Sequence, residues 1–193
     1  MASGHHIHQN YQFTQVDLPF KQTKLGIKAR LRNFSRTSDR KKMERGFEIL
    51  KKVMNSKRFQ QLVYGFVFNG ERTFHENNGM SNEEIYQYLM TGGEVLKPEH
   101  DHTMDFDLSL YRSWNPFSKV KGYTLPDTMR IWIHKKFFRR KSWTAVDVAA
   151  NLAHEWVHKM GFSHSYNYNP DRPFSVPYAI GGIVAQVAEE MGL

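Results

Sequence analysis

Three of the chain's ten histidines fall within residues 154 to 164, which read HEWVHKMGFSH. His154 and His158 are four residues apart, so on a helix their rings share one face, about one turn apart. Gly161 can adopt the left-handed conformation that ends a helix and reverses the chain, which would bring His164 back toward the other two. Three neutral imidazoles leave the fourth position of a tetrahedral Zn²⁺ open for water, as in catalytic zinc sites. We therefore expect one catalytic Zn²⁺ bound by these three histidines.

Glu155 supplies the remaining group that metal-assisted hydrolysis needs. It follows the first histidine on the same expected helix, so its carboxylate projects toward the rim of the site. There it could take a proton from water and pass it to a leaving amine. The chain has no cysteine, which excludes thiolate ligands, a cysteine nucleophile and disulfides. Any metal would have to be held by histidine and carboxylate.

The whole pattern, HExxHxxGxxH, resembles the signature of the metzincin group of zinc metallopeptidases. The resemblance implies a zincin-like α+β fold: a small mixed sheet with an antiparallel edge strand over an active-site helix, and a short C-terminal subdomain ending in a helix. It implies that the three histidines bind zinc, that Glu155 is the general base and acid, and that the edge strand holds an extended peptide. We assign that strand to MRIWIHKKF, residues 129 to 137, and expect its substrate-binding residues to be Arg130, Trp132 and His134.

The chain departs from the metzincin pattern downstream of the third histidine. Metzincins place a methionine in a tight turn beneath the zinc, but the only methionine after His164 is Met191, near the end. In the expected interval lies FSVPYAIGG, where Ser175, Pro177 and Tyr178 resemble the Ser-x-Met-x-Tyr turn of some members without its methionine. The resemblance is therefore to a divergent member, or to a sister group of zincins.

Tyr178 is a further candidate catalytic residue. In some relatives the turn tyrosine donates its hydroxyl to the developing oxyanion, and Tyr178 is expected to do the same. The alternative is a core tyrosine that opens the last helix. Tyr166 and Tyr168 are competing candidates for the same role.

Capping and periodicity predict the helices that must position these residues. Thr144 and Asp147 form a capping box for the helix that carries the first two histidines, and Ser81 and Glu84 form another. Further helices are expected behind a Ser38 N-cap, from Ser56, and from Pro177. Gly181 and Gly182 lie within the last of these helices, which suggests close packing against the active-site helix.

Two stretches alternate between apolar and polar residues, as strands with one buried face do. They are residues 103 to 111 and residues 129 to 137. A calcium or second zinc site is an alternative reading of the polar residues of the first stretch and of the segment before it. The residues concerned are His100, Asp101, His102, Asp105 and Asp107.

The length of 193 residues favours one globular unit. We expect an N-terminal arm at residues 1–30 and a single catalytic domain at residues 31–193, with an upper part 31–161 and a small lower part 162–193. The HHIH at residues 5–8 resembles a purification tag and is excluded from the site. No apolar run is long enough to span a membrane, and a secretory h-region is not visible, so the location stays open between the cytoplasm and export by another route. We expect a monomer.

The net charge of +8 is unevenly spread, because fourteen of the 27 Lys and Arg lie between Lys21 and Arg58. A solvated helix face explains this segment better than nucleic-acid binding, because no recognised nucleic-acid motif accompanies it. The first hypothesis is a zinc-dependent endopeptidase acting on peptides or proteins. The alternatives are a zincin-fold hydrolase of a non-peptide amide, and a basic module that binds nucleic acid or an acidic partner and carries a non-catalytic zinc.

Overall fold

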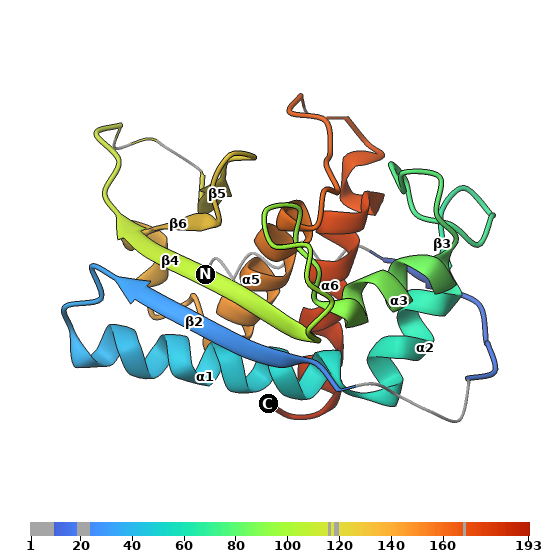
Figure 1. Cartoon of the computed structure of the whole chain (residues 1–193), viewed down its shortest axis with the longest axis horizontal. Coiled ribbons are helices and arrows are strands. Elements are labelled where there is room, and N and C mark those ends of the chain that lie inside the picture. The colour runs from blue at the N-terminus through green and yellow to red at the C-terminus, as the bar shows by residue number, and fades with distance from the viewer. Residues whose placement is uncertain (1–9, 19–23, 116, 118–119, 168) are drawn as a thin grey trace.

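The computed structural model describes residues 10–18, 24–115, 117, 120–167 and 169–193, which form a mixed α+β fold (Figure 1). The HHIH segment and Tyr168 therefore lie outside the described residues. The elements in chain order are β1 (Gln12–Phe13), β2 (Gly26–Arg32), α1 (Thr37–Met54), α2 (Lys57–Gly65), β3 (Phe66–Val67), α3 (Asn82–Thr91), β4 (Thr103–Tyr111), β5 (Gly122–Thr124), β6 (Arg130–His134), α4 (Lys135–Phe138), α5 (Ala145–Lys159), a 3-10 turn (Arg172–Phe174) and α6 (Val176–Glu190).

The main sheet has the strand order β2-β4-β6-β5. Strands β2, β4 and β6 are parallel to one another, and β5 pairs antiparallel with β6. The sheet lies in front of α5 and α6 in Figure 1, and α1 runs beneath it along β2. The alternation predicted for β4 is confirmed, because its apolar side chains are all buried in the core: Met104, Phe106, Leu108 and Leu110.

The prediction that residues 129 to 137 form the edge strand is wrong. β6 lies between β4 and β5, and the chain leaves the strand at His134 to form the short helix α4. The antiparallel edge strand is instead β5, whose three residues Gly122, Tyr123 and Thr124 are too few to show a period of two. An antiparallel edge strand therefore exists, but on different residues.

The boundary expected between residues 30 and 31 falls inside a strand. β2 pairs with β4 along its whole length, so residues 26 to 30 belong to the sheet. Leu25 is fully buried. Tyr11 donates a hydrogen bond to the Pro173 carbonyl at 3.1 Å, and its ring packs against Phe66. The described parts of residues 1–30 are therefore packed into the domain.

The capped helices match the predictions closely. Both capping boxes are formed, at Ser81 with Glu84 and at Thr144 with Asp147. Ser56 caps α2 as predicted. The prediction for α1 is two residues off, because the helix begins at Thr37 and Ser38 lies inside it.

The glycines of α6 allow close packing against α5, as predicted for the active-site helix. A Cβ on Gly181 would lie 2.9 Å from the Ala150 carbonyl oxygen and 3.3 Å from the His154 Cβ. Gly182 instead faces the Tyr11 ring. The contact at Gly181 fixes the distance between α6 and the helix that carries two of the histidines.

Replacing Gly181 with valine should therefore push the two helices apart. We expect Gly181→Val to lower the free energy of unfolding by about 2 kcal/mol, because the added side chain overlaps the backbone of α5. Glu189→Val, on an exposed position of the same helix, introduces the same side chain without this overlap and should cost about 0.5 kcal/mol. Urea unfolding of both variants measures the difference, and equal losses would show that Gly181 has no packing role.

Candidate metal centre

The fold brings the three predicted histidines together. His154 and His158 come from α5, and His164 comes from the segment after Gly161, whose φ of 92° is the left-handed conformation expected there. One ring nitrogen from each histidine lies within 4.8 Å of the others, so the group could hold a metal ion. The Nε2 atoms of His154 and His158 are 3.3 Å apart.

Backbone groups orient all three imidazoles. Nδ1 of His158 lies 2.8 Å from the Phe162 carbonyl oxygen, and Nδ1 of His164 lies 3.1 Å from that of Ser165. His154 is held by a backbone hydrogen bond to Pro177. When Nδ1 donates its proton to a carbonyl, Nε2 is left as the unprotonated nitrogen that a metal needs. The hydrogen bonds therefore select the metal-binding tautomer.

Burial keeps these imidazoles neutral. Burial lowers the pKa of His158 to about 4. It lowers the pKa of His154 well below the ordinary value for histidine, and it also lowers the pKa of His164. The charges of the neighbouring histidines and of Arg172 act in the same direction. A metal ion binds the neutral form, so at neutral pH it meets little competition from protons.

This predicts that bound metal survives mild acid. An unperturbed histidine, with a pKa of about 6.5, would be roughly nine-tenths protonated at about pH 5.5, whereas His158, with its pKa of about 4, would remain neutral. We expect metal bound at pH 7 to be retained at pH 5.5 and released as the pH falls toward 4. Metal content after gel filtration across this range measures it, and half-release near pH 6.5 would contradict the expectation.

Glu155 lies between α5 and the edge strand. Its side chain is only 5% exposed, and its Oε1 would lie 3.3 Å from a Cβ built on Gly122 of β5. Burial raises the pKa of Glu155 to about 8, while the charge of Lys159 and a hydrogen bond with Asn151 act against that rise. A carboxyl group with a pKa of about 8 is mostly protonated at pH 7, so Glu155 can donate a proton directly and becomes a base once it ionises.

Tyr178 lies against the histidines, as its candidate role requires. Its ring centroid is 4.5 Å from that of His154 and 4.8 Å from that of His164. Its competitor Tyr166 is 94% exposed. Pro177 precedes Tyr178 in the first turn of α6, and the Met191 side chain lies beyond the other end of that helix and is 37% exposed. Pro177 thus contacts a histidine in the segment where the metzincin methionine was expected.

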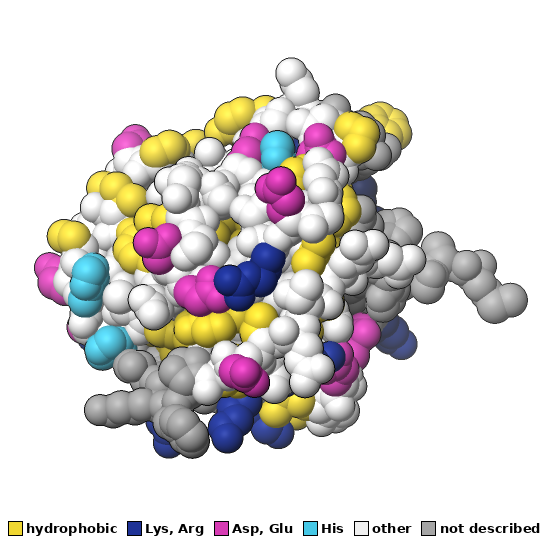
Figure 2. Space-filling model, turned by 90° about the vertical axis from the view of Figure 1, so that its right-hand side faces the viewer, with side chains coloured by type: hydrophobic (Ala, Val, Ile, Leu, Met, Phe, Trp, Pro, Cys, Tyr) yellow, Lys and Arg dark blue, Asp and Glu magenta, His cyan; other side chains and the backbone are white. Residues whose placement is uncertain are grey.

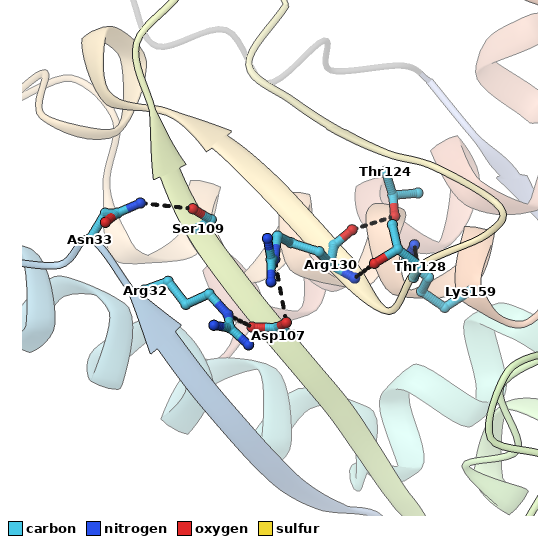
Figure 3. Close-up of polar contacts among 8 residues, drawn as sticks. All are labelled: Arg32, Asn33, Asp107, Ser109, Thr124, Thr128, Arg130 and Lys159. Atoms are coloured by element: carbon cyan, nitrogen blue, oxygen red, sulfur yellow. Dashed lines mark hydrogen bonds and ion pairs between the residues drawn. The ribbon is translucent and has the colours of Figure 1, made fainter.

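Lys159 ties α5 to the turn between β5 and β6, and sequence reasoning missed it. Its Nζ donates to the Leu125 carbonyl at 2.8 Å and to the Thr128 carbonyl (Figure 3). The residue is only 4% exposed. Lys159 comes one turn after Glu155 on α5, so a single helix positions both the carboxylate and the hairpin that carries the edge strand.

Removing this ammonium should loosen the hairpin. We expect Lys159→Met to lower the free energy of unfolding by about 2 kcal/mol, because two carbonyls lose their hydrogen-bond donor. Lys159→Arg should recover part of the loss, and Lys52→Met, at an exposed position of α1, should change little. Denaturant unfolding, with amide exchange in β5 as the local readout, tests this. An unchanged exchange rate in β5 would disprove the anchoring role.

The structure does not bring the expected substrate-binding side chains to the histidines. Ile131 and Ile133 of β6 are fully buried against the helices, so the residues that alternate with them project from the other face of the sheet. There Arg130 bonds Asp107, as Figure 3 shows, and Trp132 stacks on Tyr123. His134 is buried and accepts a hydrogen bond from the Lys136 amide.

Many of the charged residues whose role the sequence left open are paired with neighbouring groups in the structure. Within the basic segment Lys28, Arg32 and Arg58 pair with Asp101, Asp107 and Glu190, and Lys42 donates to the carbonyls of Phe138, Arg140 and Trp143. Asp105, a member of the alternative calcium cluster, pairs with Lys97. On the face seen in Figure 2, acidic and basic side chains are interspersed. These pairings favour a structural role for the residues concerned.

None of the helices among the described residues is long and apolar enough to cross a bilayer. Comparison of the chain with models of known protein families and with curated proteins gives no match.

Proposed function

We propose that this chain is a zinc-dependent endopeptidase with a zincin-like fold. The observation that carries the proposal is the convergence of three half-buried imidazoles beside a buried glutamate and an antiparallel edge strand. Of the described residues, His154, His158 and His164 would hold the ion. Glu155 would be the general base and acid, and Tyr178 a donor to the oxyanion.

The donor set fits zinc in geometry and in chemistry. Two nitrogens bound at 2.0–2.1 Å to a tetrahedral ion lie about 3.3–3.4 Å apart, and the Nε2 atoms of His154 and His158 are 3.3 Å apart. Three neutral imidazoles, each fixed by a backbone group, make the ligand set of a catalytic site with one open position. One pair of donors therefore already has the tetrahedral spacing, and the group, which lies within 4.8 Å, would have to contract to enclose an ion.

Zinc, when bound, would polarise the scissile carbonyl and make water a stronger acid. Glu155, once ionised, would accept a proton from the attacking water and pass it to the leaving amine. Tyr178 would donate its hydroxyl to the carbonyl oxygen as negative charge develops there. Asn151, one turn before Glu155, would keep the carboxylate in place through its hydrogen bond.

The edge strand supports a peptide as the substrate. β5 pairs with β6 on one side only, so its other edge offers backbone donors and acceptors to an extended chain. Gly122 brings this strand against Glu155. A peptide that pairs with β5 would therefore run past the carboxylate and the histidines.

A peptide-library digest tests the proposal. Protein loaded with one equivalent of zinc should cleave internal bonds, a chelator should abolish the cleavage, and added zinc should restore it. Cleavage of non-peptide amides without cleavage of the library would favour the alternative hydrolase. Absence of hydrolysis in a protein that binds zinc tightly would contradict the proposal.

A further inference from the structure

Arg172 places a guanidinium beside the metal centre, and neither the motif nor the proposed mechanism uses it. Its Cζ lies 4.9 Å from the centre of the Tyr178 ring, which itself packs against His154 and His164. The charge of Arg172 acts on the pKa of all three histidines, which agrees with this position.

This cation forms no ion pair with a carboxylate within the described part of the chain. Its Nη1 donates to the Tyr166 carbonyl at 3.3 Å, and its side chain also hydrogen-bonds to Tyr178. Its Nε is buried without a hydrogen-bond partner. By contrast, Arg139 holds Asp39 through three hydrogen bonds, and Arg58 holds Glu190 through two.

The backbone holds Arg172 in place. Its amide donates to Asn169 Oδ1 at 2.6 Å, and its carbonyl accepts from the amide and the hydroxyl of Ser175, the residue that begins α6. The following residue is Pro173, which restricts the turn. A preorganised guanidinium with unused donors is suited to planar anions, above all carboxylates, which it can bind through two parallel hydrogen bonds.

We propose that Arg172 binds a carboxylate of the substrate next to the scissile bond, so that the protein selects acidic peptides. This inference rests on the proposed peptidase function and names the substrate class of the same site. The carboxylate could belong to an Asp or Glu side chain or to the C-terminus of a peptide, because the guanidinium recognises the same group in both. A C-terminal preference would make the cleavage exopeptidic.

Peptide binding to a protein that cannot hydrolyse tests this proposal. The protein is the zinc-loaded Glu155→Gln variant, and the probes are two pairs of fluorescent pentapeptides measured by anisotropy. One pair carries a central Glu or Gln between amidated ends, and the other ends in a free carboxylate or an amide. We expect one carboxylate peptide to bind at least about tenfold more tightly than its neutral partner, and the pair that differs identifies the source.

Adding Arg172→Gln should abolish that difference and leave the affinity for the neutral peptides within about twofold of its original value. Arg172→Lys keeps the positive charge but loses the planar guanidinium that can form two parallel hydrogen bonds, and it should keep part of the difference in affinity. Arg58→Gln is the matched control and should keep all of the difference, because Arg58 lies on α2 and pairs with Glu190 at the far end of α6. Thermal unfolding checks that each variant is folded. If the Arg172→Gln variant does not fold, the Arg172→Lys variant is used to test the carboxylate preference.

Equal binding within both pairs would overturn the carboxylate site. So would an equal loss for charged and neutral peptides on removing Arg172, which would indicate a role in holding Tyr178. These measurements distinguish a failure of the carboxylate site from a failure of the proposed peptidase function. A carboxylate preference that depends on Arg172, in a protein that cleaves no peptide with Glu155 present, would sustain the anion site and contradict the peptidase.

Discussion

Replacing Glu155 with glutamine should lower kcat for peptide hydrolysis by about a thousandfold while the metal stays bound. Proton transfer by a positioned carboxylate is worth about 10²–10⁴-fold, and Glu155 is the buried carboxylate beside the histidines. Glutamine keeps the size of the side chain and can still bond Asn151, so the fold and the imidazoles should be unaffected. Steady-state kinetics and zinc content, measured on one preparation, give both quantities.

Glu189→Gln, an exposed change of the same type on α6, is the matched control and should leave kcat unchanged. A Glu155→Gln enzyme that keeps both its zinc and more than about a tenth of wild-type activity would contradict the role of this carboxylate.

Replacing His164 with alanine should strongly weaken zinc binding. His164 is the candidate ligand outside α5. Without it, protein side chains would fill only two of the four tetrahedral positions on a zinc ion. Loss of outer-shell partners alone weakens metal binding by about 10–100-fold, so loss of a ligand should weaken it by at least about 100-fold. Competition with a chelating dye measures the affinity.

His134→Ala is the matched control for this experiment. His134 is also buried, at 3% exposure, but it lies at the end of β6 and is not a member of the histidine group. Zinc affinity should therefore stay the same in this variant. An equal loss in both variants would mean that the effect comes from destabilising the fold.

Sequence alone predicted the parts of the site that depend on local chemistry. The capping box at Thr144 and the glycine at 161 fix where α5 begins and ends, and the spacing of His154 and His158 fixes their common face. These interactions join residues that are close in sequence, so a short stretch of sequence is enough to predict them. The prediction of close packing at Gly181 also succeeded, although its partner Ala150 is distant in sequence, since a glycine inside a helix costs stability unless something approaches it.

The errors concern partners that are distant in sequence. β6 alternates as an edge strand would, but its place in the sheet depends on β5, which is too short to predict. Nothing in the local sequence marks Arg172 or Lys159, because only the folded chain brings one against Tyr178 and the other against the β5–β6 turn. Tertiary pairing, and not local propensity, decides each of these positions.

Anomalous diffraction at the zinc edge, from crystals grown with one equivalent of zinc, would show whether the three histidines share one ion. We expect one strong peak about 2.0–2.1 Å from a ring nitrogen of each of His154, His158 and His164. A peak elsewhere on the molecule, or rings that point away from a common centre, would contradict it.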